Sequence, residues 1–359
     1  MDRELLDILM VAPYPPPAGG IAHHTKALLE AVRAEGLGAI VLDINRNEGE
    51  GIVPVFGRKD LFRKVKRTKA KLVHIHSDSF DLHYHAPVAI LAAKLSGKTA
   101  ILSIHSGDVA DYYAKTSRFK RMLMRFSIKN ANVIVADNED IARFAGSLNH
   151  GGDIHIISPF VAPPARQEPL PARLDEFAGA RKPLFVSCGS PHETYQLDKV
   201  IEAFARLLEL HRDAGLVITR TDAANEEGWS ALRRKVEGLG LTKHVRFEPD
   251  LSHEQFTELL KRANAFIRFT AHDGDSMSVR EALAVGTAVI ASDACLRPEG
   301  TILVRAGNID ELAHAMSIAG TEKPAESPKV ESSRERFMKL YKNLLNLHSS
   351  GRSNAQKSL

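Results

Sequence analysis

The sequence predicts an α/β protein with two doubly wound parallel sheets, each in a domain of its own. The chain has 359 residues, which is more than one ordinary hydrophobic core accommodates. Short apolar runs alternate with amphipathic stretches of helical spacing, a pattern typical of parallel sheets covered by helices. Six prolines between residues 159 and 183 interrupt this alternation, and it then restarts.

The first domain is expected over residues 1–160. Its first strand, 7–13, leads into the loop YPPPAGG, and the helix that follows closes at Gly36. The remaining expected elements of this domain are strands at 39–44, 71–77, 99–105, 132–138 and 153–159, helices at 86–96 and 117–129, and a loop at 48–58.

A Pro-rich linker is expected at 161–183, and the second domain at 184–331. The expected elements of this domain are strands at 184–190, 215–221, 244–250, 265–270, 287–293 and 300–306, and helices at 197–212, 227–238, 253–262, 276–285 and 308–318. We expect an amphipathic helix at 332–348 to pack back on the first domain, and a disordered tail at 349–359. In such sheets ligands bind beside the carboxyl ends of the strands, so a ligand cleft is expected there.

The composition is that of a globular protein, with 44% hydrophobic and 26% charged residues. No apolar run approaches the roughly 20 residues that span a bilayer. The N-terminal apolar run is short and follows acidic residues, unlike a signal peptide. Cys188 and Cys295 are far apart and lack metal-ligand spacing, which fits a reducing compartment. We therefore expect a cytoplasmic protein.

The segment AHDGDSMSVREALAVGTAVIASD, residues 271–293, carries the strongest functional signal. It follows a buried strand and runs into a helix, so backbone amides and the helix dipole are expected to form an anion site. Carboxylates repel phosphate but accept hydrogen bonds from the vicinal hydroxyls of a sugar. The pattern therefore indicates a nucleotide-sugar site. The alternative is that Asp273 and Asp275 cap the helix and that Glu281 is a solvated side chain.

With two Rossmann-like domains and this segment in the second of them, the chain resembles the GT-B glycosyltransferases of the retaining GT4 type over roughly residues 6–345. That family carries two Glu residues separated by seven positions, followed by a small-residue helix; this chain reads DGDSMSVREALAVG. The resemblance implies that Glu281 holds the donor ribose and that Asp273, a shorter acid here, contacts the transferred sugar as a catalytic residue. It also implies donor contacts from the amides of Asp275, Ser276 and Met277.

Two loops of the first domain extend the resemblance. PYPPPAGGIAHHTKALL is similar to the family's Gly-rich loop, in which Gly19 and Gly20 would approach the donor phosphate because a Cβ would block it. The alternative is a Pro-Gly turn before a helix. LSIHSGD is similar to the family's HG-x-D loop, which would make His105 a catalytic residue facing the transferred sugar. The alternative is a structural histidine at a strand end.

The chain departs from the family after the first strand of the second domain. The family carries an Arg and a Lys there, which neutralise the diphosphate leaving group, and this chain has Ser190 and Tyr195 at those positions. A hydroxyl can bind phosphate but does not match the electrostatics of a cation. We expect Ser190 and Tyr195 to remain donor-binding residues and Arg268 to replace the missing charge. The alternative for Arg268 is a salt bridge between domains.

The resemblance implies a hexosyltransferase that moves a sugar from a nucleoside-diphosphate sugar to an acceptor hydroxyl with retention of configuration. It implies no metal ion and no other cofactor. Two alternatives stay open. One is a catalytically impaired relative that binds a protein or membrane partner, and the other is a sugar-nucleotide epimerase on the same fold.

Basic residues concentrate in the first domain. Segment 58–71 holds eight Lys or Arg and one Asp, and segment 114–129 holds six and no acid. On the predicted helix, four basic residues share one face: Arg118, Arg121, Arg125 and Lys129. Basic amphipathic helices are typical of contacts with anionic lipids, which favours a peripheral location on the inner face of the membrane. At such a location the acceptor is expected to be a saccharide or a lipid-linked saccharide, and the role to be surface polysaccharide or glycolipid assembly. The alternative is a solvated face; nucleic-acid binding is not expected, because segment 58–71 lacks interleaved aromatic residues.

Overall fold

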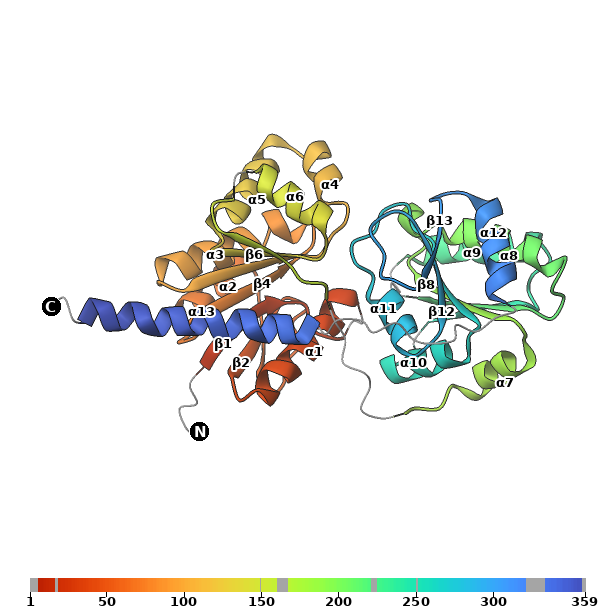
Figure 1. The fold of residues 1–359 in the computed structure, drawn as a ribbon, viewed down its shortest axis with the longest axis horizontal. Helices are drawn as coiled ribbons and strands as arrows, with labels where there is room; N and C mark the ends of the chain where they lie inside the picture. Colours follow the sequence, from red (N-terminus) through yellow and green to blue (C-terminus); the bar gives the residue numbers. More distant parts are fainter. Residues whose placement is uncertain are drawn as a thin grey trace. The chain divides into compact units, whose positions relative to one another are not determined.

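The computed structural model describes residues 6–16, 19–148, 150–159, 167–220, 225–249, 251–320 and 333–356. The chain forms two compact units, of which unit 1 comprises Met1–Val161 and Ser332–Leu359, and unit 2 comprises Ala162–Glu331. Each unit is a parallel sheet with helices on both faces (Figure 1). The predicted α/β architecture with two doubly wound sheets is confirmed.

The sheet of unit 1 is parallel throughout, with the strand order β3-β2-β1-β4-β5-β6-β7. Its strands are β1 (Leu6–Ala12), β2 (Gly38–Asp43), β3 (Ile52–Pro54), β4 (Leu72–Ser77), β5 (Thr99–Ile104), β6 (Val133–Ala136) and β7 (Asp153–Ile156). β3 lies within residues 48–58, where the sequence analysis expects a loop. The sequence does not predict this strand, because three residues are too few to show an alternating pattern. The order reverses between β1 and β4, where the carboxyl ends of such sheets form a crevice.

Helices cover both faces of this sheet. The residues of β1 alternate between the faces: Ile8 and Met10 pack with the core residues of α1 (Gly20–Ala34) and α13 (Ser333–Gln356). Leu9 and Val11 pack on the opposite face. The elements on that opposite side are α2 (Arg58–Arg67), the short helix η1 (Asp81–His83), α3 (Ala86–Leu95), α4 (Val109–Lys115), α5 (Arg118–Asn130) and α6 (Glu139–Ser147).

The C-terminal helix belongs to the core of unit 1. Phe337 and Tyr341 of α13 are fully buried, and the Tyr341 hydroxyl lies 2.5 Å from Nδ1 of His74 on β4. The helix continues to Gln356, so residues 349–356 are helical where the sequence analysis expects a disordered tail. No proline interrupts this stretch, and the helix, once anchored by its buried turns, extends through it.

The sheet of unit 2 is also parallel, with the order β10-β9-β8-β11-β12-β13. Its strands are β8 (Leu184–Gly189), β9 (Gly215–Arg220), β10 (Val245–Glu248), β11 (Ala265–Arg268), β12 (Ala288–Ser292) and β13 (Thr301–Val304). Its helices are α7 (Ala172–Ala180), the short η2 (Glu193–Tyr195), α8 (Leu197–Leu208), α9 (Glu226–Gly238), α10 (His253–Arg262), α11 (Met277–Ala284) and α12 (Ile309–Ala319). The order reverses between β8 and β11, so the loops after these two strands meet at the switch point.

The predicted Pro-rich linker 161–183 is largely part of unit 2. It contains α7, whose Leu174 and Phe177 are buried in the same core cluster as Leu184 of β8. Proline is tolerated before a helix and in its first turn, so the prolines here do not exclude a helix. A linker predicted from proline content alone is therefore too long. Residues 160–166 lie outside the described part of the chain.

Among the described residues, no helix combines the length and apolar character that crossing a bilayer requires.

Candidate functional site

Four of the predicted site residues of unit 2, Ser190, Tyr195, Arg268 and Asp273, lie at or after the ends of the two strands at its switch point. Ser190 follows the last residue of β8, and Tyr195 ends η2 in the same loop. Arg268 is the last residue of β11, and Asp273 lies in the loop between β11 and α11. Because β8 and β11 are parallel neighbours, their carboxyl ends lie at one edge of the sheet.

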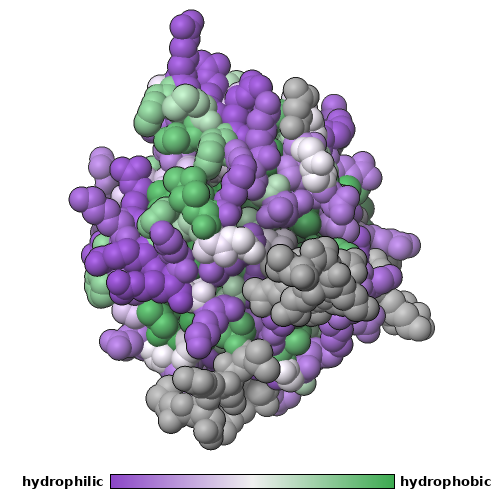
Figure 2. Space-filling view, turned by 90° about the vertical axis from the view of Figure 1, so that its left-hand side faces the viewer, coloured by the Kyte–Doolittle hydropathy of each residue, from purple (hydrophilic) through white to green (hydrophobic). Residues whose placement is uncertain are grey.

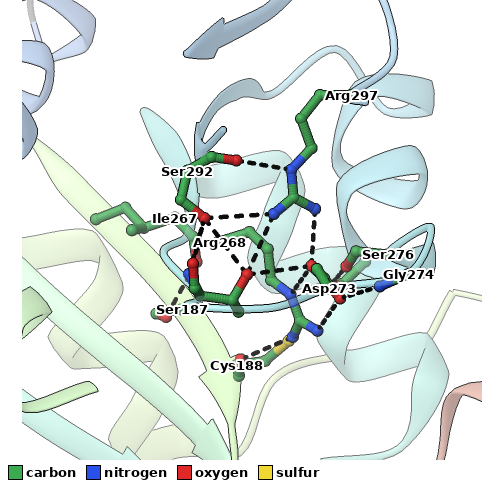
Figure 3. Close-up of polar contacts among 11 residues, drawn as sticks. Ser187, Cys188, Ile267, Arg268, Asp273, Gly274, Ser276, Ser292 and Arg297 are labelled. Carbon is green, nitrogen blue, oxygen red and sulfur yellow. Dashed lines mark hydrogen bonds and ion pairs between the residues drawn. The ribbon is translucent and has the colours of Figure 1, made fainter. Parts of the chain in front are cut away.

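Two guanidinium groups enclose the carboxylate of Asp273 (Figure 3). Arg268 donates from Nε to Asp273 Oδ2 and from Nη2 to Oδ1, both at 2.9 Å. Arg297 donates from Nη1 to Asp273 Oδ2 at 2.7 Å, and from Nε to the carbonyl of Ser292, at the end of β12, at 3.0 Å. We call Arg268, Asp273 and Arg297 the arginine–aspartate cluster.

The cluster is buried and carries a net positive charge. The side chains of Arg268, Asp273 and Arg297 are 13%, 8% and 2% exposed. Burial alone would raise the pKa of Asp273, but the charges and hydrogen bonds of Arg268 and Arg297 outweigh it and hold this pKa well below its usual range. Asp273 is therefore ionised, and two guanidinium groups against one carboxylate leave one positive charge at the edge of the sheet.

Tyr195 packs on the arginine–aspartate cluster. The Arg268 guanidinium lies 5.0 Å from the centre of the Tyr195 ring, within the range of a cation–π contact. The ring occupies the space beside Gly189, where an added Cβ would come within 2.5 Å of Tyr195 Cδ1. Tyr195, at the position of the family's Lys, thus holds the cation that we expect to replace that Lys.

The start of α11 keeps its backbone amides available. Ser276 is the N-cap, and its side chain makes no capping hydrogen bond to the helix. Asp275 instead accepts from Arg280, with Nε at 2.8 Å and Nη2 at 2.6 Å, and the Ser276 hydroxyl lies 3.0 Å from that of Ser278. Met277 is the first helical residue. Neither Asp273 nor Asp275 has the capping role that the alternative interpretation gives them, and the amides at this end can bind an anion.

Glu281 has a histidine partner that the sequence analysis does not identify. Its Oε1 lies 2.6 Å from Nε2 of His253, the first residue of α10, and the Glu281 side chain is only 17% exposed. A capping box between Ser252 and Gln255 fixes the start of α10 and thereby the place of His253. Glu281 is therefore oriented by a neighbour rather than freely solvated.

In unit 1, the two glycines begin α1 without a packing reason. Gly19 is the N-cap of α1 and Gly20 its first residue. A Cβ at either position would meet none of the described atoms within 4 Å, and neither has a positive φ. Nothing in the described fold of unit 1 requires glycine here, which leaves the close approach of a ligand as a reason for both.

His105, at the end of β5, has both ring nitrogens engaged. Nδ1 lies 2.9 Å and 3.0 Å from the two carboxylate oxygens of Asp137, and Nε2 lies 3.0 Å from Nδ1 of His76 on β4. Burial and the neighbouring histidines lower the pKa of His76 well below its usual range, so its ring is neutral. The arrangement orients His105, and a hydrogen bond from this ring to a sugar would have to replace the one to His76.

Three histidines of unit 1 are close enough to hold a metal ion. One ring nitrogen from each of His24, His76 and His105 lies within 4.8 Å of the other two. Imidazole nitrogens are common zinc ligands, and Asp137 stands behind His105 as a supporting carboxylate does at such sites. The 3.0 Å separation of His76 and His105 is also that of an ordinary hydrogen bond, so the convergence of these two rings is explained without an ion.

Both cysteines lie near the arginine–aspartate cluster without being activated. The carbonyl of Cys188 accepts from Arg268 Nη1 at 3.5 Å. Burial raises the pKa of the Cys188 thiol and raises that of Cys295 to about 11. Both thiols are protonated at neutral pH and are poor nucleophiles.

Comparison with known proteins identifies a family model for one part of the chain. Residues 173–321 match the model of glycosyl transferases group 1, a range that includes Ser190, Tyr195, His253, Glu281 and the arginine–aspartate cluster. No curated protein sequence matches the chain significantly.

Solved structures resemble the whole chain. Sucrose-phosphate synthase from Thermosynechococcus elongatus superimposes with a TM-score of 0.66 at 15% identity, covering 98% of this chain and 100% of that one. HepE from Anabaena in complex with UDP-glucose gives 0.70 at 13% identity, with coverage of 96% and 100%. A UDP-forming α,α-trehalose-phosphate synthase from Burkholderia xenovorans, in complex with glucose-6-phosphate, gives 0.67 at 13% identity, with coverage of 94% and 96%. At these identities the likeness concerns the fold, which is GT-B.

Proposed function

We propose that this protein is a group 1 glycosyltransferase that moves a sugar from a nucleoside-diphosphate sugar to an acceptor hydroxyl. The observation that carries the proposal is the arginine–aspartate cluster, a buried positive charge at the switch point of unit 2. It lies inside the segment that matches the family model. A solved neighbour, HepE, binds UDP and UDP-glucose, which makes a uridine donor the first to test.

The donor diphosphate would bind between the arginine–aspartate cluster and the start of α11. A leaving diphosphate gains negative charge as the glycosidic bond breaks, and a fixed cation that needs no reorganisation stabilises that charge. In this proposal Asp273 positions Arg268 and Arg297, and the direct contact of Asp273 with the transferred sugar stays a prediction. The amides of Asp275, Ser276 and Met277 would complete the anion site.

The finer features of the reaction are proposals from the resemblance. They are the GT4 type, transfer of a hexose with retention of configuration, catalysis without a metal ion or other cofactor, and a cytoplasmic role in surface polysaccharide or glycolipid assembly. The chemistry of unit 2 is compatible with metal-free catalysis, because the arginine–aspartate cluster supplies the positive charge that a metal ion would otherwise provide.

Ser190 and Tyr195 favour one competing function, that of a relative which binds a nucleotide sugar without transferring it. Neither side chain carries the charge that the family's Arg and Lys supply. The two functions differ in turnover and not in donor binding. Release of free UDP from UDP-sugar with an acceptor present, and conversion of one UDP-sugar into another, would separate transfer and epimerisation from binding alone.

The test is a thermal-shift panel of UDP, GDP, ADP and their common sugar conjugates, with and without EDTA. We expect one base to raise the melting temperature and EDTA to leave the shift unchanged. A shift that EDTA abolishes would contradict metal-free binding and would direct attention to His24, His76 and His105. No shift with any nucleotide would contradict the proposed donor.

Gly20→Ala is expected to lower the affinity for a nucleoside diphosphate at least fivefold without lowering the melting temperature of the free protein, because Ala favours the helical conformation at least as well as Gly. An added Cβ meets open space in the described structure, so it would obstruct only a bound ligand. The measurement is isothermal titration of UDP, or of the nucleotide that the panel selects. Gly179→Ala in α7 is the matched control, because its Cβ also meets nothing within 4 Å. Equal affinities of the Gly20→Ala variant and wild type would remove Gly20 from the donor site.

Glu281→Ala is expected to weaken nucleoside-diphosphate binding at least about tenfold, which corresponds to the loss of one charge-assisted hydrogen bond to the ribose. Pyrophosphate, which has no ribose, should bind the variant and wild type equally. Titration of both ligands separates a ribose contact from a general disturbance of the site. A parallel loss of pyrophosphate affinity would show that Glu281 acts on the diphosphate region instead.

A further inference from the structure

One face of unit 1 is built from helices that pack side by side. α2 packs against α3, and α3 packs against α5 and η1. All contribute to the core on the same side of the sheet. We call the outer surface of α2, η1, α3 and α5 the helical face.

Exposed apolar side chains concentrate on and beside this helical face. In the part of residues 6–159 that the structure describes, the exposed large apolar residues all lie between positions 56 and 122: Phe56, Phe80, Tyr84, Leu91, Leu95, Phe119 and Met122. Four of these side chains are more than half exposed: Phe56 at 66%, Phe119 at 65%, Leu95 at 63% and Met122 at 55%. Figure 2, which views the side of unit 1 that lies left in Figure 1, shows apolar groups surrounded by hydrophilic ones. Isolated apolar residues are common on protein surfaces, but such clustering is typical of a binding surface.

The same elements carry a large excess of positive charge. α2 (RKDLFRKVKR) has six Lys or Arg and one Asp, and α5 (RFKRMLMRFSIKN) has five and no acid. The acid of α2, Asp60, is neutralised by Lys64 at 2.7 Å, and the acid of η1, Asp81, is buried with its Oδ1 2.6 Å from Nδ1 of His85. The exposed acids nearby, Asp108 and Asp111, belong to the start of α4 and not to the helical face.

Apolar and basic side chains alternate at short range. On α5, Phe119 and Met122 stand between Arg118, Arg121 and Arg125. In α2, the side chains of Arg58, Lys59, Phe62 and Arg63 line a shallow hollow together with Val88 of α3. Arg58 also lies 5.1 Å from the centre of the Tyr84 ring. An anionic bilayer offers partners for both kinds of side chain, because headgroup phosphates attract the cations while the acyl boundary accepts the apolar groups.

We propose that the helical face docks unit 1 onto the surface of an anionic lipid bilayer. Lys and Arg supply long-range attraction, and Phe119, Met122, Leu91 and Leu95 enter the headgroup region. A nucleic acid would use the charges but not the aliphatic side chains. The docking rests on unit 1 alone. The acceptor class that follows from it, a lipid-linked saccharide, rests on the proposed function.

The test is flotation of the full chain with vesicles of pure phosphatidylcholine and with vesicles containing equal parts of phosphatidylglycerol. We expect the protein to bind the anionic vesicles only. Inorganic phosphate, added while sodium chloride is lowered to keep the ionic strength constant, should not release the protein from these vesicles. The combined variant Arg118→Glu, Arg121→Glu and Arg125→Glu should lower the partition coefficient at least about a hundredfold, since each basic residue contributes about fivefold. The variant Phe119→Ser with Met122→Ser should lower it about tenfold without loss of stability, because both side chains are exposed.

Matched controls come from unit 2, where Arg212, Arg234 and Leu210 are exposed. The variant Arg212→Glu with Arg234→Glu, and the variant Leu210→Ser, should bind vesicles as wild type does. Equal binding by the α5 variants and wild type, or no binding by wild type, would overturn the proposal. Sensitivity to the arginines but not to Phe119 and Met122 would also overturn it, since it would indicate a surface for polyanions in general. Nucleotide thermal shifts of the same variants should be unchanged, so failure of docking is distinguishable from failure of the donor site.

Discussion

Replacing Asp273 with Asn is expected to lower the free energy of unfolding of unit 2 by about 3 kcal/mol. The carboxylate is 8% exposed and accepts hydrogen bonds from two arginines. The change leaves the charges of Arg268 and Arg297 side by side without a counter-charge in a buried place. Removing one member of a buried ion pair is costly for this reason, even where the intact pair contributes little net stability.

The chain contains its own probe for this experiment. Its single tryptophan, Trp229, is fully buried in the core of unit 2, so its fluorescence during urea denaturation reports the unfolding of that unit. Asp213→Asn, which removes an exposed carboxylate of unit 2, is the control and should change stability little. A midpoint for Asp273→Asn equal to that of wild type would contradict the buried cluster.

The same carboxylate adds a pH dependence with a defined sign. Its pKa is lowered in the folded state, so the stability that it contributes is fully present above the unfolded value of about 3.9. That contribution is lost as the pH falls from about 4 towards the folded pKa. The difference in stability between wild type and Asp273→Asn should therefore be constant from pH 7 to about pH 5 and become smaller as the pH falls towards about 3. A difference that does not decrease below about pH 4 would contradict the ionised state of Asp273.

Arg268→Ala is expected to weaken nucleoside-diphosphate binding more than tenfold. The variant removes the guanidinium that stands at the carboxyl end of β11 and leaves Asp273 with Arg297 only, which abolishes the net positive charge. A lost charge-assisted contact with phosphate has an effect of this size. Titration of UDP and of pyrophosphate is the measurement, and both affinities should fall, in contrast to Glu281→Ala.

A double variant distinguishes direct contact of Arg268 with phosphate from a purely structural role in pairing with Asp273. If Arg268 acts only by pairing with Asp273, then Arg268→Ala with Asp273→Ala removes both partners and should restore nucleotide affinity. If Arg268 contacts phosphate, affinity stays low in the double variant while stability partly recovers. Arg268→Lys keeps the charge but cannot form the two-pronged pair with Asp273, and we expect it to recover only part of the affinity. Arg212→Ala, an exposed arginine of unit 2, controls for the loss of one charge.

Local patterns were sufficient to predict most of the fold and the place of the candidate site. The helix and strand patterns placed β11, the Asp273 loop and α11 correctly, because these elements follow one another in the chain and depend on neighbouring residues. Arg297 was not predicted, since it meets Asp273 only when β11 and β12 pair in the sheet. Its position shortly after β12 is a usable signal, because loops after adjacent parallel strands share one edge.

The partners of Glu281 and His105 depend even more on tertiary structure. His253 lies 28 residues before Glu281 and reaches it from the start of another helix. Asp137 and His76 come from the ends of two different strands beside β5. Neither pair has a sequence spacing that would identify it. The sequence analysis does not predict α7, and here the reason is local. The prolines at 159–171 indicate a linker more strongly than the apolar residues Leu174 and Phe177 indicate a helix, although the structure buries both side chains.

The path of the chain through unit 1 constrains the order in which the protein can fold during synthesis. The sheet and first helices of unit 1 leave the ribosome before unit 2, whereas α13 leaves it afterwards. The core residues that α13 supplies, Phe337 and Tyr341 among them, pack on the side of β1 that holds Ile8 and Met10. Domains generally fold during translation, in which the ribosome adds about 5–20 residues per second. That side of the sheet of unit 1 therefore stays partly exposed to solvent until all of unit 2 and then α13 have been translated.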